Sequence, residues 1–269
     1  MPIMTAIAAV LAGLLAVAPR PGATCVRADA DGVTVVRGGD AVVAGTGLRR
    51  WLATMAVLQL VDHGIVDPRR PVRDEIPGFR DGPFGRPARV HHLLFHTAGL
   101  SASAATSGDV EADLDRHGPT RREPGRLVEP SPLGDELLEA IVERRTGRPF
   151  SAYVRENLLE PLGIATVAGA TEGPGEIALR AKDVARLSAA VVARGTHGGV
   201  VLWDRRTGRL LLAAPGGLVA PTGARPGAPR TAPSGHRLVY RLGRGRGGAR
   251  LVVDLASDVA WVTAGGRCR

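Results

Sequence analysis

Residues 47–67, GLRRWLATMAVLQLVDHGIVD, are the stretch of sequence that decides the fold. Apolar side chains recur at helical spacing from Leu52 to Leu60, which indicates a helix with a buried face. Gly64 follows the last of them, and glycine is typical of the position after a helix end. The stretch therefore predicts one long buried helix, and the flanking segments must pack around it.

Upstream of this helix the sequence predicts a β-hairpin. Two short apolar runs within residues 23–36 meet at a turn at residues 29–32. The apolar segment at residues 4–18 is predicted to be a further buried helix, too short to span a bilayer. A secretion signal is the alternative for this segment, but no Lys or Arg precedes it and Pro19 would follow the cleavage site.

Downstream, the sequence predicts helices and then strands. Helical spacing returns at residues 90–96, 134–146, 150–159 and 181–195, whereas residues 97–126 show little periodicity. The last third alternates Val and Leu runs with Gly-rich turns, which predicts strands at residues 199–203, 210–213, 238–242, 251–255 and 259–263. This order predicts an α/β (α+β) fold: an antiparallel sheet flanked by helices, with an inserted, mostly helical domain.

The composition is that of a globular protein with an arginine bias. The chain has 269 residues, 44% of them hydrophobic, and a net charge of +9 that comes almost wholly from arginine. The bias runs through the whole chain, and the short Arg-Gly runs lack the interleaved aromatic residues of nucleic-acid stacking platforms. We expect neither a nucleic acid nor a membrane as a partner.

The cysteines and histidines predict neither a disulfide framework nor a metal site. Cys25 and Cys268 are too few for such a framework and are predicted to be free thiols in a reducing compartment, which favours a cytoplasmic location. His92 and His96 lack the adjacent glutamate of a zinc-protease helix, so a structural role is favoured for them and for His91. No metal and no cofactor are predicted.

Several segments match one family in their order and approximate spacing. They are AVLQLVDHGIVD at 56–67, PVRDEIPGF at 71–79, VHHLLFHTAGL at 90–100, EPLGI at 160–164 and ALRAKDVARL at 178–187. Together they resemble the serine hydrolases of the β-lactamase (class C) and penicillin-binding-protein family. The resemblance implies a sheet domain of residues 1–46 and 181–269, a helical domain of residues 47–180, and a cleft that the two share.

The family's chemistry starts with a serine that attacks an acyl carbon, assisted by a lysine one helical turn later. Counting along the predicted helix puts Gly47 at the serine position and Arg50 at the lysine position. Glycine has no oxygen and an arginine does not deprotonate in proteins, so the pair cannot perform this step. Thr46 with Arg49 would be a displaced pair, but a one-residue shift rotates the register by about 100°.

The other two motifs of the family are also altered. Tyr-x-Asn falls on Pro130-Ser131-Pro132, which removes the phenol and the amide. Lys/His-Thr/Gly-Gly, which lies on a strand, best matches Arg246-Gly247-Gly248, where a cation and two glycines remain. A guanidinium group suits a carboxylate or phosphate. The resemblance therefore implies that an anionic or acyl small molecule binds to Arg50, Ser131, Arg246, Gly247 and Gly248.

Glu129, Asp135 and Glu136 lie beside the altered second motif. They are expected to form a solvated helix entrance, because carboxylates near the N-terminal end of a helix favour its dipole. A repurposed acid/base pair is the alternative. His236 and Tyr240 are further groups that could titrate or donate near the cleft.

The altered motifs predict a non-hydrolytic homologue of the β-lactamase-like serine hydrolases that has lost Ser-x-x-Lys and Tyr-x-Asn. One alternative is a repurposed biosynthetic enzyme that catalyses a non-covalent isomerisation, cyclisation or elimination through positioning and electrostatics. Another is residual hydrolysis of esters or β-lactams through Thr46 or Ser131.

Overall fold

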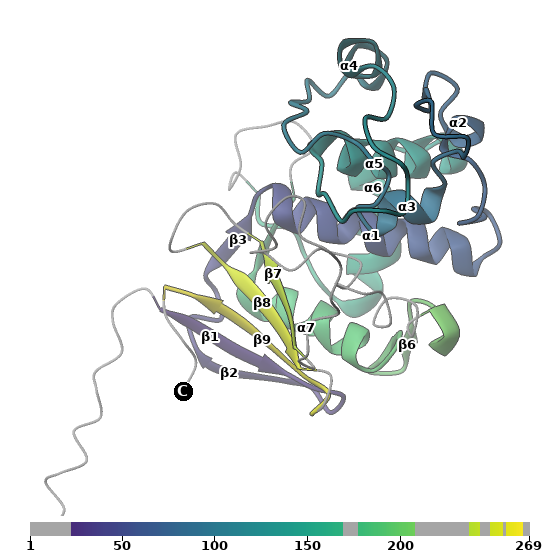
Figure 1. Ribbon diagram of the computed structural model, residues 1–269. Helices are drawn as coiled ribbons and strands as arrows, with labels where there is room; N and C mark the ends of the chain where they lie inside the picture. Colours follow the sequence, from purple (N-terminus) through teal and green to yellow (C-terminus); the bar gives the residue numbers. More distant parts are fainter. Residues whose placement is uncertain (1–22, 169–176, 208–236, 243–247, 255–256, 266–269) are drawn as a thin grey trace, which may run out of the picture.

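The computed structural model describes residues 23–168, 177–207, 237–242, 248–254 and 257–265. A sheet built from both ends of the chain lies beside a group of helices formed by its middle (Figure 1). The predicted helix at residues 4–18 and the predicted strand at residues 210–213 lie outside the described residues. The mixed fold with an antiparallel sheet is as predicted, while the domain boundaries stay a prediction.

The main sheet has five antiparallel strands in the order β2-β1-β9-β8-β7. Their bounds are β1 Thr24–Ala28, β2 Val33–Arg37, β7 Arg237–Arg241, β8 Arg250–Asp254 and β9 Val259–Ala264. The predicted hairpin is confirmed, and its turn is stabilised by the Asp29 carboxylate, which accepts hydrogen bonds from the backbone N–H groups of Asp31 and Gly32. The long α7, Ala181–Val192, covers one face of the sheet and contacts β9 and β1.

Cys25 lies in β1, between β2 and β9, and corrects one prediction. It is buried and disulfide-bonded, and no free cysteine occurs among the described residues. The prediction of a free thiol was wrong for Cys25, because the number of cysteines in a sequence does not show whether one of them is disulfide-bonded, and Cys268 lies outside the described residues. Free thiols therefore no longer support a cytoplasmic location, which stays a prediction.

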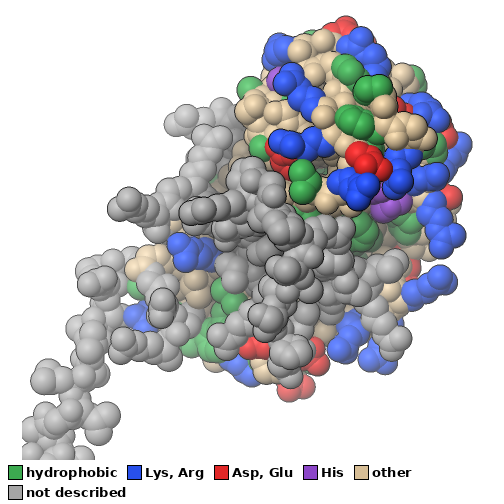
Figure 2. Space-filling view, viewed as in Figure 1, with side chains coloured by type: hydrophobic (Ala, Val, Ile, Leu, Met, Phe, Trp, Pro, Cys, Tyr) green, Lys and Arg blue, Asp and Glu red, His purple; other side chains and the backbone are tan. Residues whose placement is uncertain are grey.

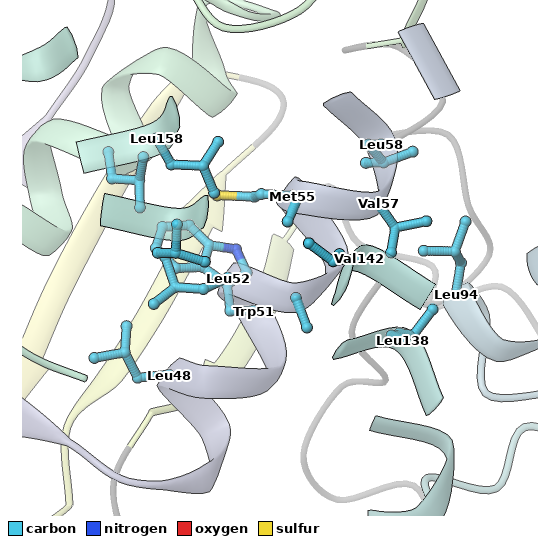
Figure 3. Packing of buried hydrophobic residues seen from close by; sticks show 14 of the residues in the cluster. Leu48, Trp51, Leu52, Met55, Val57, Leu58, Leu94, Leu138, Val142 and Leu158 are labelled. Atoms are coloured by element: carbon cyan, nitrogen blue, oxygen red, sulfur yellow. The ribbon is translucent and has the colours of Figure 1, made fainter. Parts of the chain in front are cut away.

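The helical part is built around α1, Thr46–Asp62. Every residue of α1 from Trp51 to Leu60 is buried, as in a helix that is enclosed on all sides. Figure 3 shows Met55 beside Leu158 and Val57 near Leu94. The other helices are α2 Val72–Glu75, α3 Val90–Leu94, α4 Val110–His117, α5 Pro132–Thr146 and α6 Phe150–Val154, which continues as a π turn, Arg155–Leu159, and a 3₁₀ turn, Glu160–Leu162. The predicted long buried helix is confirmed.

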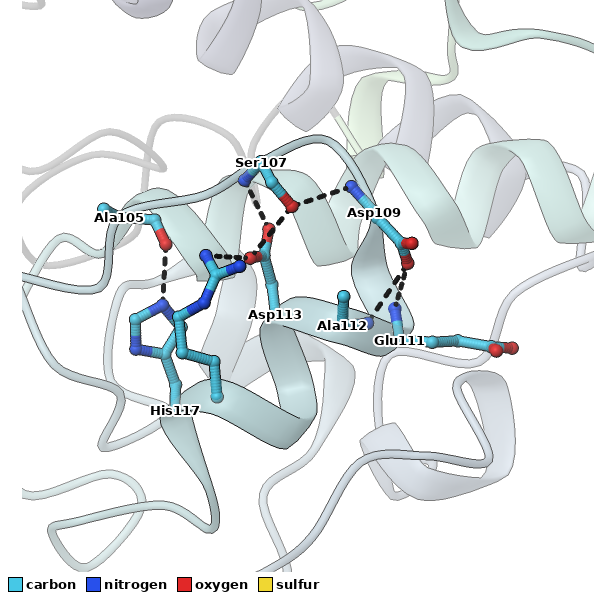
Figure 4. Close-up of polar contacts among 8 residues, drawn as sticks. Ala105, Ser107, Asp109, Glu111, Ala112, Asp113 and His117 are labelled. Atoms are coloured by element: carbon cyan, nitrogen blue, oxygen red, sulfur yellow. Dashed lines mark hydrogen bonds and ion pairs between the residues drawn. The ribbon is translucent and has the colours of Figure 1, made fainter.

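The sequence did not predict α4, which lies in the stretch without periodicity. Its stabilising contacts are polar: the Asp109 carboxylate accepts hydrogen bonds from the N–H groups of Glu111 and Ala112 at the helix start. Figure 4 shows the buried Asp113 carboxylate bonded to Ser107. The same carboxylate accepts a 2.8 Å hydrogen bond from Arg116. A helix anchored by capping and buried polar contacts leaves little hydrophobic pattern to detect.

Two short strand pairs complete the described elements. Val42–Ala44 (β3) pairs with Ala178–Arg180 (β4), and Thr196–His197 (β5) pairs with Val200–Val201 (β6), so the strand predicted at residues 199–203 is shorter than expected. β3 leads directly into α1 through Gly45, whose φ of 117° is accessible to glycine. The β3–β4 pair thereby fixes where α1 begins.

The surface carries charges of both signs. On the described part of the face in Figure 2, blue basic side chains lie among red acidic ones over the helices. None of the helices in the described ranges is both long and apolar enough to cross a membrane.

Candidate functional site

The first turn of α1 lies beside the end of β7. The N–H of Leu48 donates a hydrogen bond to the carbonyl oxygen of Leu242 at 3.2 Å. Gly47 is half-buried in this turn, and Thr46, the first residue of the helix, is exposed. The position that the resemblance assigns to the nucleophile therefore lies at the junction of sheet and helices, as a catalytic residue would require.

Arg50 is bound by a carboxylate of α5. Its Nε lies 2.7 Å and its Nη2 2.5 Å from Oδ2 of Asp135, and the two side chains are only 21% and 13% exposed. Arg49 makes the equivalent contact one turn along α5, with Nε 2.6 Å and Nη2 2.5 Å from the oxygens of Glu139. The carboxylates of α5 thus neutralise both guanidinium charges at the start of α1.

The groups around the Arg50–Asp135 pair have shifted pKa values. Burial raises the pKa of Asp135 to about 6, against the opposing effect of Arg50. Burial, and then the charge of Arg50, lower the pKa of His96 to about 3, so this imidazole is neutral at physiological pH. Oδ1 of Asp135 and Nε2 of His96 are buried without a hydrogen-bond partner among the described residues. His96 also has a positive φ of 52°, which is unusual outside glycine.

Ser131, at the middle of the second motif, is the residue before α5 and is buried. Its hydroxyl donates a 2.7 Å hydrogen bond to the carbonyl oxygen of Ser101, and Pro132 occupies the first helical position. A cavity of about 10 Å³ lies next to Ser131 and His96, which is room for one water molecule. The hydroxyl is therefore engaged in a structural contact.

The third motif is only partly described. Arg246 and Gly247 lie outside the described residues, and Gly248 is half-buried two residues before β8. The strand whose end contacts α1 is β7, and its last residue, Arg241, is followed by Leu242 and Gly243. This cation-x-Gly sequence is a second candidate for the motif. The sequence alone favours Arg246-Gly247-Gly248, because it does not show that β7 is the strand that reaches α1.

Glu129 and Glu136, the other two carboxylates considered for an acid/base pair, contact different parts of the structure. The Glu129 carboxylate binds Nε of Arg122 at 2.8 Å and the N–H of Ala102 at 3.3 Å. Glu136 faces Asp113 of α4, and burial together with the charge of Asp113 raises the pKa of Glu136 to about 7. His236 lies outside the described residues, and Tyr240 lies in β7.

The histidine side chains of α3 make backbone contacts. Nδ1 of His91 lies 2.8 Å from the carbonyl oxygen of Pro68, and Nδ1 of His92 accepts a hydrogen bond from the N–H of Arg89 at 3.0 Å. Burial, followed by the charges of His91, Arg89 and Arg86, lowers the pKa of His92 to about 4. Among the described residues no cluster of His, Cys, Asp and Glu has the arrangement of a metal site.

Three features define the class of the serine β-lactamase-like hydrolases: the strand order of the main sheet, the buried central helix α1, and the junction between the sheet and this helix. Residues 51–263 match the family model described as Beta-lactamase, so the chain belongs to the β-lactamase family. This confirms the resemblance and the fold class. The matched region begins at residue 51 and so does not include Gly47 or Arg50.

The sequence relatives are partial matches. Penicillin-binding protein 4 of Amycolatopsis lactamdurans is 29% identical over 45% of this chain and 34% of the relative. Esterase EstB of Burkholderia gladioli is 31% identical over 49% of this chain and 39% of the relative. The chain thus matches well under half the length of either relative.

Solved structures share the fold at low identity. An octameric penicillin-binding protein homologue from Pyrococcus abyssi superposes with a TM-score of 0.70 at 13% identity, covering 92% of this chain and 70% of that one. A putative β-lactamase from Bacteroides dorei superposes with a TM-score of 0.67 at 17% identity, covering 96% and 88%.

Proposed function

We propose that this member of the β-lactamase family does not carry out serine acyl transfer, and that it holds an anionic or acyl small molecule beside the start of α1. The observation that carries the proposal is the pair at the motif positions, Gly47 with no nucleophilic atom and Arg50 bound to Asp135. Acyl transfer requires an oxygen or sulfur nucleophile and a base that can accept its proton. Neither requirement is met by these side chains.

Arginine and glycine residues at the end of β7 and in the sequence between β7 and β8 support the proposal that an anion binds here. Arg246, Gly247 and Gly248 are the proposed contacts for the anion, with Arg241 as a further one because its strand ends beside α1. Arg50 would join them when Asp135 is protonated, since a pKa near 6 frees the guanidinium in mildly acidic solution. Ser131 would contribute at the edge of the site, through exchange of its bond to Ser101.

The decisive experiment is covalent labelling. The purified protein is incubated with a fluorophosphonate and, separately, with benzylpenicillin, and its intact mass is measured. We expect no adduct on the wild type. An adduct would overturn the proposal, and its presence or absence in Thr46→Ala and Ser131→Ala would identify the residue that carries it.

A repurposed, non-covalent enzyme is the second candidate, and His96 with Asp135 is the observation that favours it. Both side chains are in electrostatic contact with Arg50, and the Asp135 carboxyl, whose pKa is about 6, can exchange a proton near neutral pH. The cavity of about 10 Å³ at His96 is smaller than any such substrate and counts against this candidate. Turnover of a biosynthetic-type substrate that is lost in Asp135→Asn would favour it.

Residual esterase or β-lactam hydrolysis is a third candidate, which the family match and the partial match to an esterase support. The Ser131 hydroxyl is bonded to Ser101, which weakens it as a nucleophile. Nitrocefin and p-nitrophenyl ester assays on the wild type, Thr46→Ala and Ser131→Ala test this candidate. Activity that disappears in one of the two variants would establish it.

A further inference from the structure

A cavity of about 650 Å³ opens at the C-terminal end of α1, away from the candidate site. It lies between this helix end, the loop that follows it, α3, and the segment after β6. Leu58, which lines the cavity, is eleven residues after Gly47, or about 16 Å along the helix axis. The cavity is therefore separate from the region in which the family's motifs lie.

Part of the cavity lining is apolar. Leu58 and Val61 contribute to it from α1, and Leu94 and Phe95 from α3 and its end. Phe95 is only half-buried, so part of its ring faces solvent. A volume of this size, with aromatic and aliphatic walls, is in the range of sites for small organic ligands.

The acidic groups of the cavity are engaged in the protein's own hydrogen bonds. Asp62 accepts one bond from the Thr207 hydroxyl at 2.8 Å and another from the N–H of Asp204 at 3.1 Å. Asp204 in turn accepts a 2.6 Å bond from the N–H of Thr207. These contacts attach the segment after β6 to the end of α1. Asp67 accepts a 2.8 Å bond from the N–H of Arg69.

The two arginine side chains of the cavity have no such partners among the described residues. Arg69 and Arg206 are exposed, line the cavity, and form no side-chain ion pair or hydrogen bond within the described ranges. Every acidic side chain in the lining accepts at least one protein hydrogen bond, whereas both guanidinium groups are left with their donors unused. Both guanidinium groups therefore have their donors available to a ligand.

We propose that this cavity binds a small amphipathic anion. Its apolar body lies on Leu58, Val61 and Phe95, and its carboxylate or phosphate accepts hydrogen bonds from Arg69 and Arg206. Charge-assisted bonds from a planar guanidinium to such groups are among the strongest in proteins. The site stands apart from the proposed function, and labelling at the start of α1 does not bear on it.

The test uses four probes, titrated into the full chain by isothermal calorimetry. Hydrocinnamate and phenyl phosphate carry an aromatic body and an anion, 2-phenylethylamine has the same kind of body with a cation, and acetate has the anion alone. We expect at least one of the two aromatic anions to bind, and the preferred one to identify the headgroup. Acetate and 2-phenylethylamine are expected to bind at least tenfold more weakly.

Two double variants then locate the site. Arg69→Gln/Arg206→Gln is expected to weaken binding of the preferred anion at least tenfold. Arg70→Gln/Arg205→Gln removes the same charge from the neighbouring exposed positions, which do not line the cavity, and is expected to bind as the wild type does. The four side chains are exposed, so both variants should keep the wild-type melting temperature.

Three results would each overturn the proposal. They are the absence of binding by either aromatic anion at millimolar concentration, equal binding of 2-phenylethylamine, and equal weakening in the two double variants. Equal weakening would indicate attraction by the net charge of the chain rather than a built site.

Discussion

Arg50 and Asp135 form a largely buried ion pair, and we expect the removal of either partner to destabilise the fold. Arg50→Met would leave the Asp135 carboxylate buried without a counter-charge, which typically costs about 3–5 kcal/mol of unfolding free energy. The carboxyl can avoid this cost by binding a proton, so we expect a larger loss at pH 8 than at pH 5. Urea unfolding at both pH values measures the difference.

The exposed pair Arg70–Asp74 is the control for this prediction. The two side chains are 50% and 39% exposed, so Arg70→Met should cost at most about 1 kcal/mol and should do so equally at both pH values. Equal losses for Arg50→Met at pH 5 and pH 8 would mean that Asp135 is not buried as a charge.

Glu136 predicts a second pH dependence of stability. Its pKa in the fold, about 7, lies above the ordinary glutamate value of 4.5, so the folded state holds this proton more tightly than the unfolded state. The penalty is absent below about pH 4.5, grows as the pH rises, and is complete above about pH 7. The groups that face it are Asp113 and its partner Arg116 on α4, and Glu139 on its own helix.

Glu136→Gln should therefore become more stable relative to the wild type as the pH rises from 5 to 8. Melting temperatures at a series of pH values measure this, with the exposed Glu111→Gln as the control. A constant difference between wild type and Glu136→Gln across this range would contradict the prediction.

At the scale of the element, the link between α3 and α5 depends on a close backbone approach at Gly99. Gly99 has a φ of 78°, and a β-carbon built on it would lie 2.2 Å from the carbonyl oxygen of Arg122. Gly118 has a similar φ of 70° with no atom within 4 Å of such a β-carbon. A comparison of the two positions separates the cost of the backbone angle from the cost of the clash.

Gly118→Ala should cost about 1–3 kcal/mol, because its φ of 70° and ψ of −160° form a backbone conformation that residues with a β-carbon rarely adopt. Gly99→Ala should cost more than this, because the backbone of residues 121 and 122, whose N–H groups bond to the Gly99 carbonyl, must move. Denaturant unfolding compares the two variants. Equal losses of unfolding free energy would show that the backbone at Arg122 can move away from the added β-carbon at little cost.

At the scale of the whole molecule, the sequence predicted those features of the fold that depend on local patterns of residues. The apolar spacing of α1 and the alternation in β1 and β2 were sufficient for the fold, and motif order was sufficient for the family. The contact between Arg50 and Asp135 joins residues 85 positions apart, and no local pattern reports it. The end of β7 beside α1 was likewise hidden, because strand order follows from the closed tertiary structure.

The disulfide of Cys25 belongs to the same scale, because β1 is the strand through which the first part of the chain joins the last. β1 lies between β2 and β9, so the sheet is complete only when segments from opposite ends of the sequence pair. A covalent bond at Cys25 reduces the entropy that the unfolded chain gains when this pairing is lost, which typically contributes about 2–5 kcal/mol. We expect dithiothreitol to lower the melting temperature of the wild type. Cys25→Ser should melt near the reduced wild type and should not respond to dithiothreitol, whereas a wild type indifferent to the reductant would mean that the sheet closes without help from this bond.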